Sequence, residues 1–133
     1  MNIVFIADFF ADEVLGGGEL NNEELIRLLI ERGHTVSEIK SSRVSPVLLN
    51  HTKGCVFIVS NFVQLSEESK NALMTRKFVI YEHDHIYLRS RNPSLYENYL
   101  APKKEIINYD VFKNAKAVFC QTKFHSDIVE KNL

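Results

Sequence analysis

The sequence has few cysteines, almost no net charge and no long apolar run, and each shortage excludes a class of protein. Its two cysteines, Cys55 and Cys120, lie in apolar stretches without CxxC spacing, so we expect reduced core residues and no redox pair or structural zinc. The formal net charge of −1 gives no general attraction to nucleic acid. No run approaches the roughly 20 apolar residues of a membrane span, and the first residues lack the basic start of a signal peptide. We therefore predict a cytoplasmic protein that does not bind nucleic acid.

What is present is the composition of an ordinary globular core. Hydrophobic residues make up 45% of the 133 positions and charged residues 25%, which is usual for a soluble domain. The length falls in the range of roughly 100–200 residues per domain. We expect a single domain over residues 1–133.

Short apolar runs rich in β-formers alternate with helical patterns along the chain. The runs are Ile3–Ala7, Thr35–Ile39, Cys55–Val59, Phe78–Tyr81 and Ala117–Cys120. All but the second are almost continuously apolar, as expected for strands buried on both faces. Strands that alternate with helices indicate βαβ units. The predicted fold class is α/β: a Rossmann-like doubly wound parallel sheet of about five strands with flanking helices.

Three helices have clear sequence signals. We predict them over residues 19–32, 66–75 and 123–129. Asn21 and Glu24 could form a capping box, although the first helix could also begin as early as Gly18. Gly33 is placed to end this helix in the left-handed conformation. Thr122 is a candidate N-cap for the last helix.

A glycine-rich turn connects the first strand to the first helix. Ligands of doubly wound sheets collect at the carboxyl ends of the strands, and a helix N-terminus there offers free amide groups and a partial positive charge. We expect a phosphate or diphosphate at this turn, the alternative being a flexible turn without a ligand. The substrate-binding candidates here are Asp8, Phe9, Gly16, Gly17, Gly18 and Glu19.

Two other ligand classes do not fit the strand ends. The dinucleotide fingerprint requires a glycine or alanine where this chain has Asn21, and its turn is much shorter. A receiver domain would carry its phosphorylated aspartate after the third strand, where Ser60 and Asn61 stand. We count Ser60 and Asn61 as further substrate-binding candidates.

The densest polar cluster follows the fourth strand. It consists of Glu82, His83, Asp84 and His85, and in an extended chain the two histidines would share one side. Such an array can bind a metal, hydrogen-bond a polyol or move protons. The alternative is a pair of structural histidines. We take His83, Asp84 and His85 as catalytic candidates and assign no metal ligands.

The segment from Ile86 to Asn114 should cover the strand ends. Its length and Pro102 indicate one or two helices with a break. Arg89 and Arg91 could hold an anionic group of the substrate, or they could simply be solvated. We include both as substrate-binding candidates.

Three motifs together resemble a known family. Gly17-Gly18-Glu19 at the first helix, His83-Asp84 after the fourth strand and the segment from Ala115 to Thr122 are similar, in order and spacing, to the N-terminal domain of GT-B retaining glycosyltransferases of glycosyltransferase family 4. The match covers nearly the whole chain. The resemblance implies one half of a GT-B fold.

The resemblance also implies roles for these residues. In the family, the glycine-rich loop lies beside the donor diphosphate and the acceptor, which places those roles on Gly17, Gly18 and Glu19. The histidine lies near the transferred sugar, which indicates His83, with His85 as a second candidate. No cofactor is implied: the nucleotide-sugar donor is a co-substrate and a hydroxyl compound is the acceptor. Phe9, Phe10 and Tyr87 would be stacking surfaces for the acceptor.

One departure from the family is large. Members of the family bind the nucleotide mainly through a C-terminal Rossmann domain, which these 133 residues do not contain. The resemblance thus implies a truncated acceptor-side domain whose partner is the missing domain and which alone has no turnover. Two alternatives remain open. The chain could be a non-catalytic binding domain, which could form a homodimer through the apolar docking surface, or it could hold a metal at His83 and His85.

Overall fold

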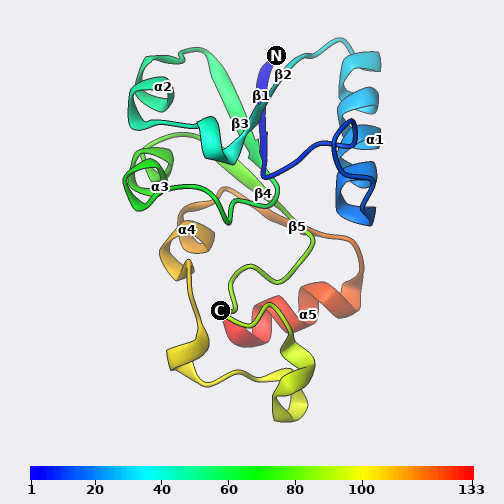
Figure 1. Cartoon of the computed structure of the whole chain (residues 1–133), viewed down its shortest axis with the longest axis vertical. Helices are drawn as coiled ribbons and strands as arrows, with labels where there is room; N and C mark the ends of the chain where they lie inside the picture. The colour runs from blue at the N-terminus through cyan, green and yellow to red at the C-terminus, as the bar shows by residue number, and fades with distance from the viewer.

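Five parallel strands form the centre of the fold, and they are the five that the apolar runs predict. A computed structural model describes all residues from 1 to 133. The strands are β1 (Asn2–Ala7), β2 (Thr35–Lys40), β3 (Cys55–Val59), β4 (Phe78–Glu82) and β5 (Val118–Cys120). Their order across the sheet is β2-β1-β3-β4-β5, and every neighbouring pair is parallel (Figure 1). The α/β fold class and the five-stranded parallel sheet are therefore confirmed.

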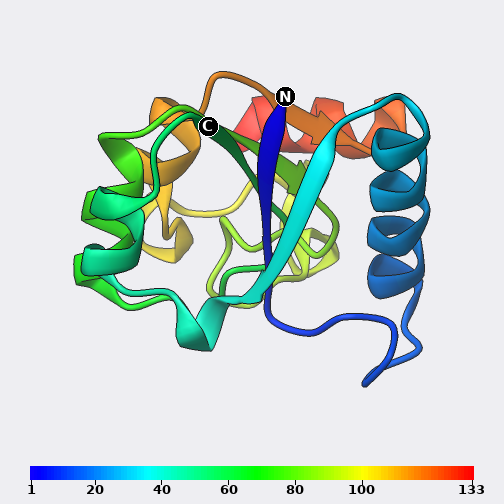
Figure 2. The same ribbon diagram turned by 90° about the horizontal axis from the view of Figure 1, so that it is seen from above.

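Helices cover both faces of this sheet. The helix α1 (Gly17–Glu31) lies on one face, against β2. On the other face α2 (Pro46–His51) packs against α3 (Glu67–Met74), and α3 packs against α4 (Tyr109–Asn114). Figure 2 shows the sheet between these two layers, with α5 (Lys123–Asn132) beside the edge strand β5. The chain turns from one layer to the other between β1 and β3, which is the switch point of the sheet.

The two faces of the sheet carry cores of unequal size. Seventeen buried apolar residues form the larger core, which joins the sheet to α2, α3 and α4 and extends to the segment after β4 and to α5; among them are Leu49, Leu73 and Phe112. Only four, Phe5, Ala7, Phe10 and Ile26, form the core beneath α1. The α1 side is therefore thinly covered near the edge strand, where Phe119 is 55% exposed.

Glycines define both ends of α1. The helix begins at Gly17, with Gly16 as an N-cap that has no capping side chain. The predicted capping box of Asn21 and Glu24 is wrong, because both residues already lie inside the helix. The predicted end is confirmed: Gly33 has φ of +89°, and its N–H and that of His34 donate to the carbonyls of Ile30 and Leu29, as in a Schellman motif.

The other helices agree in part with their predictions. Helix α3 begins after the N-cap Ser66, and α5 begins after Thr122, whose hydroxyl accepts from the N–H of His125. The segment between β4 and α4 contains two single-turn 3-10 helices, at Pro93–Leu95 and Lys103–Glu105, and between them a tight turn at Glu97–Tyr99 in which Asn98 and Tyr99 have positive φ. It turns back on itself through an antiparallel bridge of Leu88 and Ile106. Of the one or two helices expected there, the structure has one short α-helix, α4.

Candidate functional site

The N-terminus of α1 opens at the carboxyl edge of the sheet without a capping side chain. Gly16 is its extended N-cap, and the first helical turn holds Gly17, Gly18 and Glu19. The first amide N–H groups of a helix have no partner within it, so this end can bind an anion. The carboxylate of Glu19 folds back against Gly16. A phosphate bound here would therefore have to compete with Glu19.

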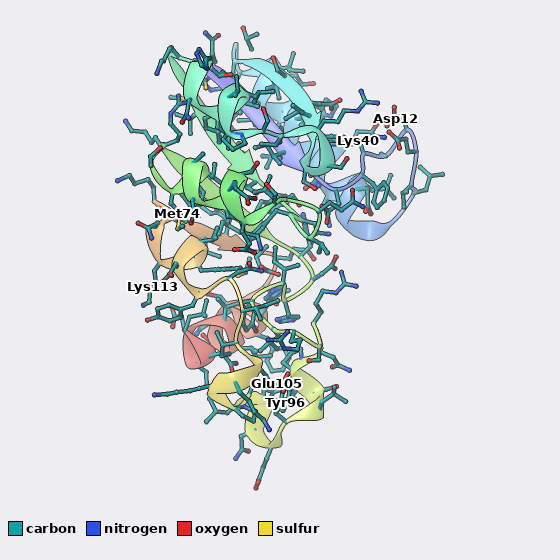
Figure 3. All side chains as sticks on the ribbon, turned by 60° about the vertical axis from the view of Figure 1, so that its left-hand side comes forward. Asp12, Lys40, Met74, Tyr96, Glu105 and Lys113 are labelled. Carbon is teal, nitrogen blue, oxygen red and sulfur yellow. The ribbon has the colours of Figure 1, made fainter.

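The loop that carries these glycines is tied to the sheet by an ion pair. Lys40, at the end of β2, places its Nζ 2.5 Å from a carboxylate oxygen of Glu13. Figure 3 shows Lys40 extending toward this loop beside Asp12. The pair links the end of β2 to the loop that precedes α1. It therefore helps to position this loop at the carboxyl edge of the sheet.

Four polar side chains from four elements form a hydrogen-bonded series, here termed the polar row. The buried Asn22 of α1 donates from Nδ2 to Oγ of Ser60, after β3, at 3.1 Å. Its Oδ1 lies 2.9 Å from Nε2 of His83, after β4. On the other side of the imidazole, Nδ1 lies 2.5 Å from Nε2 of Gln121, after β5. The polar row thus joins the carboxyl ends of β3, β4 and β5 to α1.

His83 faces the first turn of α1. A Cβ built on Gly18 would lie 3.5 Å from Cγ of His83, so a side chain at position 18 would be in van der Waals contact with the imidazole, whereas glycine leaves that space free. The ring of Tyr81 packs edge-on against the imidazole, with 4.4 Å between centroids. Burial lowers the pKa of His83 below its ordinary value, against the opposing charges of Asp84 and Glu19. The imidazole is therefore neutral at pH 7.

The structure brings other predicted residues to the same edge. The exposed Asp84 accepts a hydrogen bond from Nδ2 of Asn61 at 2.7 Å, which links the ends of β3 and β4. Phe9 is 39% exposed beside the start of the glycine loop. Phe10, by contrast, is buried in the small core under α1, so it offers no surface for stacking.

The chain is not extended at His85. Its φ of +52° takes it out of the extended conformation, so the extended arrangement that would place both histidines on one side is not formed. The His85 ring stacks on His125 of α5, with 4.1 Å between centroids. Its Nδ1 lies 2.8 Å from the hydroxyl of Tyr87. Burial and the neighbouring His125 lower the pKa of His85 to about 4.

Tyr87 also takes a role different from the expected one. It is completely buried in the larger core, and it was a candidate for stacking on an acceptor. Its ring packs edge-on against Phe112, and burial raises the pKa of its hydroxyl. Tyr87 is therefore part of the scaffold.

Glu82 is the most buried charged residue of the chain, and the sequence analysis assigned it no role. It is 0% exposed and accepts one hydrogen bond, from the N–H of Ile86 at 3.3 Å. Nε2 of His125 lies 3.9 Å from its Oε1. Burial raises the pKa of Glu82 to about 7. The alternation along β4 could have revealed this burial, because Phe78, Ile80 and Glu82 point to the same face.

Asp8 lies at the switch point but faces inward. It is 7% exposed. Its carboxylate accepts hydrogen bonds from the Ser41 hydroxyl and from the N–H groups of Val63 and Gln64, the last two at 3.1 Å. The loop after β3 therefore closes over the space where a doubly wound sheet usually holds its ligand. Asp8 fixes this loop, and its oxygens are engaged by the protein itself.

Arg89 and Arg91 do not join the glycine turn. Both are exposed, and Arg89 lines a hollow of about 450 Å³ together with residues of α3 and α4, on the face of the sheet opposite α1. The nearest acidic group to Arg89 is Glu105, at 3.9 Å. Arg89 is thus separated from the polar row by the sheet.

Two members of the polar row, Asn22 and Gln121, were not predicted. Asn22 lies four residues after Gly18, so both occupy one face of α1. Gln121 is the first residue after the last strand. Sequence spacing alone could therefore have identified both residues, once Gly18 and the strand ends had been assigned.

Comparison of the chain with known protein families, with curated proteins and with solved structures gave no match. No group of three or more histidine, cysteine, aspartate or glutamate side chains is arranged to hold a metal ion. None of the helices has the length and apolar character needed to cross a bilayer.

Proposed function

We propose that this chain is the acceptor-side domain of a glycosyltransferase that moves a sugar from a nucleotide-diphosphate donor to an acceptor hydroxyl. The observation that supports this most is the placement of the His83 ring beside Gly18, where only the absence of a side chain leaves space between them. It combines an uncapped helix terminus, suited to a diphosphate, with a neutral imidazole, suited to a sugar hydroxyl. The resemblance of the same motifs to glycosyltransferase family 4 points to the same activity.

The helix terminus and the His83 imidazole would have different roles in the reaction, which follow from their chemistry. In the transfer, the bond between the sugar and the diphosphate breaks and a bond to the acceptor oxygen forms, so negative charge develops on the leaving diphosphate. Amide N–H groups at Gly17, Gly18 and Glu19 would stabilise this charge electrostatically. His83 would hydrogen-bond the sugar, and the exposed Phe9 offers an apolar surface at the same edge.

The substitution Gly17→Ala tests this proposal. Nothing lies within 4 Å of a Cβ at Gly17, and the residue is helical, so alanine should leave the stability unchanged or raise it by up to about 1 kcal/mol. The methyl group would occupy the space of a bound phosphate, so we expect binding of UDP-glucose or GDP-mannose to weaken at least about fivefold. Amide chemical shifts in a titration of labelled protein measure both affinity and location.

Asn21→Ala is the matched control, since Asn21 is exposed on the same helix. Asn21→Ala should bind UDP-glucose or GDP-mannose with the same affinity as the unaltered protein. Equal affinity of Gly17→Ala and the unaltered protein would refute the proposal, as would the absence of shifts at residues 16–19 with either nucleotide sugar.

A non-catalytic interaction domain is the second candidate. Two aromatic residues near the sheet edge favour it: Phe119 is 55% exposed and Phe124 63% exposed. Exposed apolar groups of this kind mark interaction surfaces when they are contiguous. This candidate predicts a defined dimer in sedimentation velocity that dissociates in Phe119→Ser. A monomer at concentrations of about 100 μM would count against it.

A further inference from the structure

Both nitrogens of the His83 ring have partners, and the chemistry of the partners fixes the ring's proton. As its amide is oriented in the structure, Asn22 presents Oδ1, which can only accept, so the Nε2 atom 2.9 Å away carries the hydrogen. Gln121 is oriented with Nε2, which can only donate, 2.5 Å from Nδ1, so Nδ1 is the bare nitrogen. The polar row therefore selects one neutral tautomer, with hydrogen on Nε2.

The two partners differ in how firmly they are held. Asn22 is 3% exposed, and its amide nitrogen is held by Ser60, which is 0% exposed. Gln121 is exposed on the first turn after β5. A ligand can therefore displace Gln121 from Nδ1, whereas the contact at Nε2 is buried in the protein.

We propose that Asn22, supported by Ser60, is the positioning residue of this site: it fixes His83 as the Nε2–H tautomer, so that Nδ1 accepts a hydrogen bond from a ligand hydroxyl in place of Gln121. The ligand group at this point is a donor, which excludes a phosphate or carboxylate oxygen there. The identity of the hydroxyl, on the transferred sugar or the acceptor, rests on the proposed function.

The tautomer is measured directly by long-range ¹H–¹⁵N NMR of histidine-labelled protein, without any ligand. The unaltered protein should show His83 with Nε2 protonated and Nδ1 bare. Asn22→Leu should convert the ring to a mixture of tautomers, because the exposed Gln121 can turn its amide to present either its nitrogen or its oxygen to Nδ1. Asn21→Leu, on the exposed side of the same helix, should not. Gln121→Ala should leave the tautomer unchanged, because Asn22 still holds Nε2. A His83 ring with hydrogen on Nδ1 would overturn the inference, as would an Asn22→Leu variant that keeps the Nε2–H form alone.

A second variant keeps the test valid if Asn22→Leu does not fold. In Asn22→Asp, a carboxylate replaces the amide oxygen and can accept from Nε2–H and from the Ser60 hydroxyl. We expect the Nε2–H tautomer to persist and the titration midpoint of His83 to rise by about one pH unit or more, because the new charge stabilises the imidazolium. The charges already near His83 are Asp84, Glu19 and His125.

Asn21→Asp adds the same charge to the same turn and should move the midpoint much less. Equal shifts in the two aspartate variants would show that Asn22 has no special contact and would overturn the inference. The measurement is independent of the proposed function. A protein with the fixed tautomer that binds no nucleotide sugar would refute that function alone.

Discussion

Replacing Glu82 by glutamine is expected to stabilise the protein at pH 8 by up to about 3 kcal/mol and to give no gain at pH 4. Glu82 is completely buried, and burial raises the pKa of its carboxyl from its ordinary value of 4.5 to about 7. Between these two values the folded protein holds a proton that the unfolded chain releases. The free energy of unfolding therefore falls as the pH rises from about 4.5 to 7, and it stays lower above that range. Glutamine, which is neutral at every pH, removes this loss.

Three histidines produce the opposite trend in the same pH range. Burial lowers the pKa of His83, His85 and His125, so the unfolded chain takes up protons first and stability is lost as the pH falls below about 6.5. In the unaltered protein, the gain in stability that Glu82 gives on acidification partly cancels the loss caused by the three histidines. Glu82→Gln should therefore show a steeper loss of stability on acidification than the unaltered protein.

Urea unfolding followed by circular dichroism at pH 4.5, 6 and 8 measures these differences. The control is Glu130→Gln, which makes the same chemical change at an exposed position of α5 and should alter stability by less than about 0.5 kcal/mol at every pH. The groups that face Glu82 are Asp84, His85, Tyr87, Cys120 and His125. A Glu82→Gln variant less stable than the unaltered protein at pH 8 would contradict the expected burial of an ionised carboxylate.

The second large effect is expected from Asp8→Ala. The change leaves the buried Ser41 hydroxyl and the part-buried N–H groups of Val63 and Gln64 without their acceptor. A buried donor without a partner costs about 1–3 kcal/mol, whereas water can reach the part-buried ones at a smaller cost. We expect a total loss of about 2–4 kcal/mol in the free energy of unfolding, which is a large part of the stability of a small domain.

The free energy of unfolding of Asp8→Asn should lie between those of the unaltered protein and Asp8→Ala. One acceptor oxygen remains in asparagine, but its amide nitrogen now faces a donor. Asp12→Ala is the control, because Asp12 is exposed on the same loop; it should change stability by less than about 0.5 kcal/mol. Urea unfolding at pH 7 is the measurement. A loss below about 1 kcal/mol in Asp8→Ala would mean that Asp8 is not a structural residue, and its assignment as a substrate ligand would regain support.

Local sequence signals located the elements of the site but not its contacts. The glycine turn, His83 and the strand-end residues Ser60 and Asn61 were predicted at the carboxyl edge, and the structure places them there. These predictions succeeded because parallel strands end at a common edge. The placement of Gly18 beside His83 and the link of Asn22 to Ser60 depend on how far α1 advances along the sheet, which no local pattern specifies.

The sequence by itself determined the five strands, the end of α1 at Gly33 and the start of α5 after Thr122. These features depend on hydrophobic period and on backbone conformation, which neighbouring residues fix. Only the tertiary structure decided that Asp8 binds the loop after β3, that His85 leaves the extended conformation and stacks on His125, and that Glu82 is buried beside His125. Each of these depends on partners 40 or more residues away or on a single backbone turn. Hydrogen-bond partners and burial are properties of packed elements, so they arise only when the sheet and its two helical layers assemble.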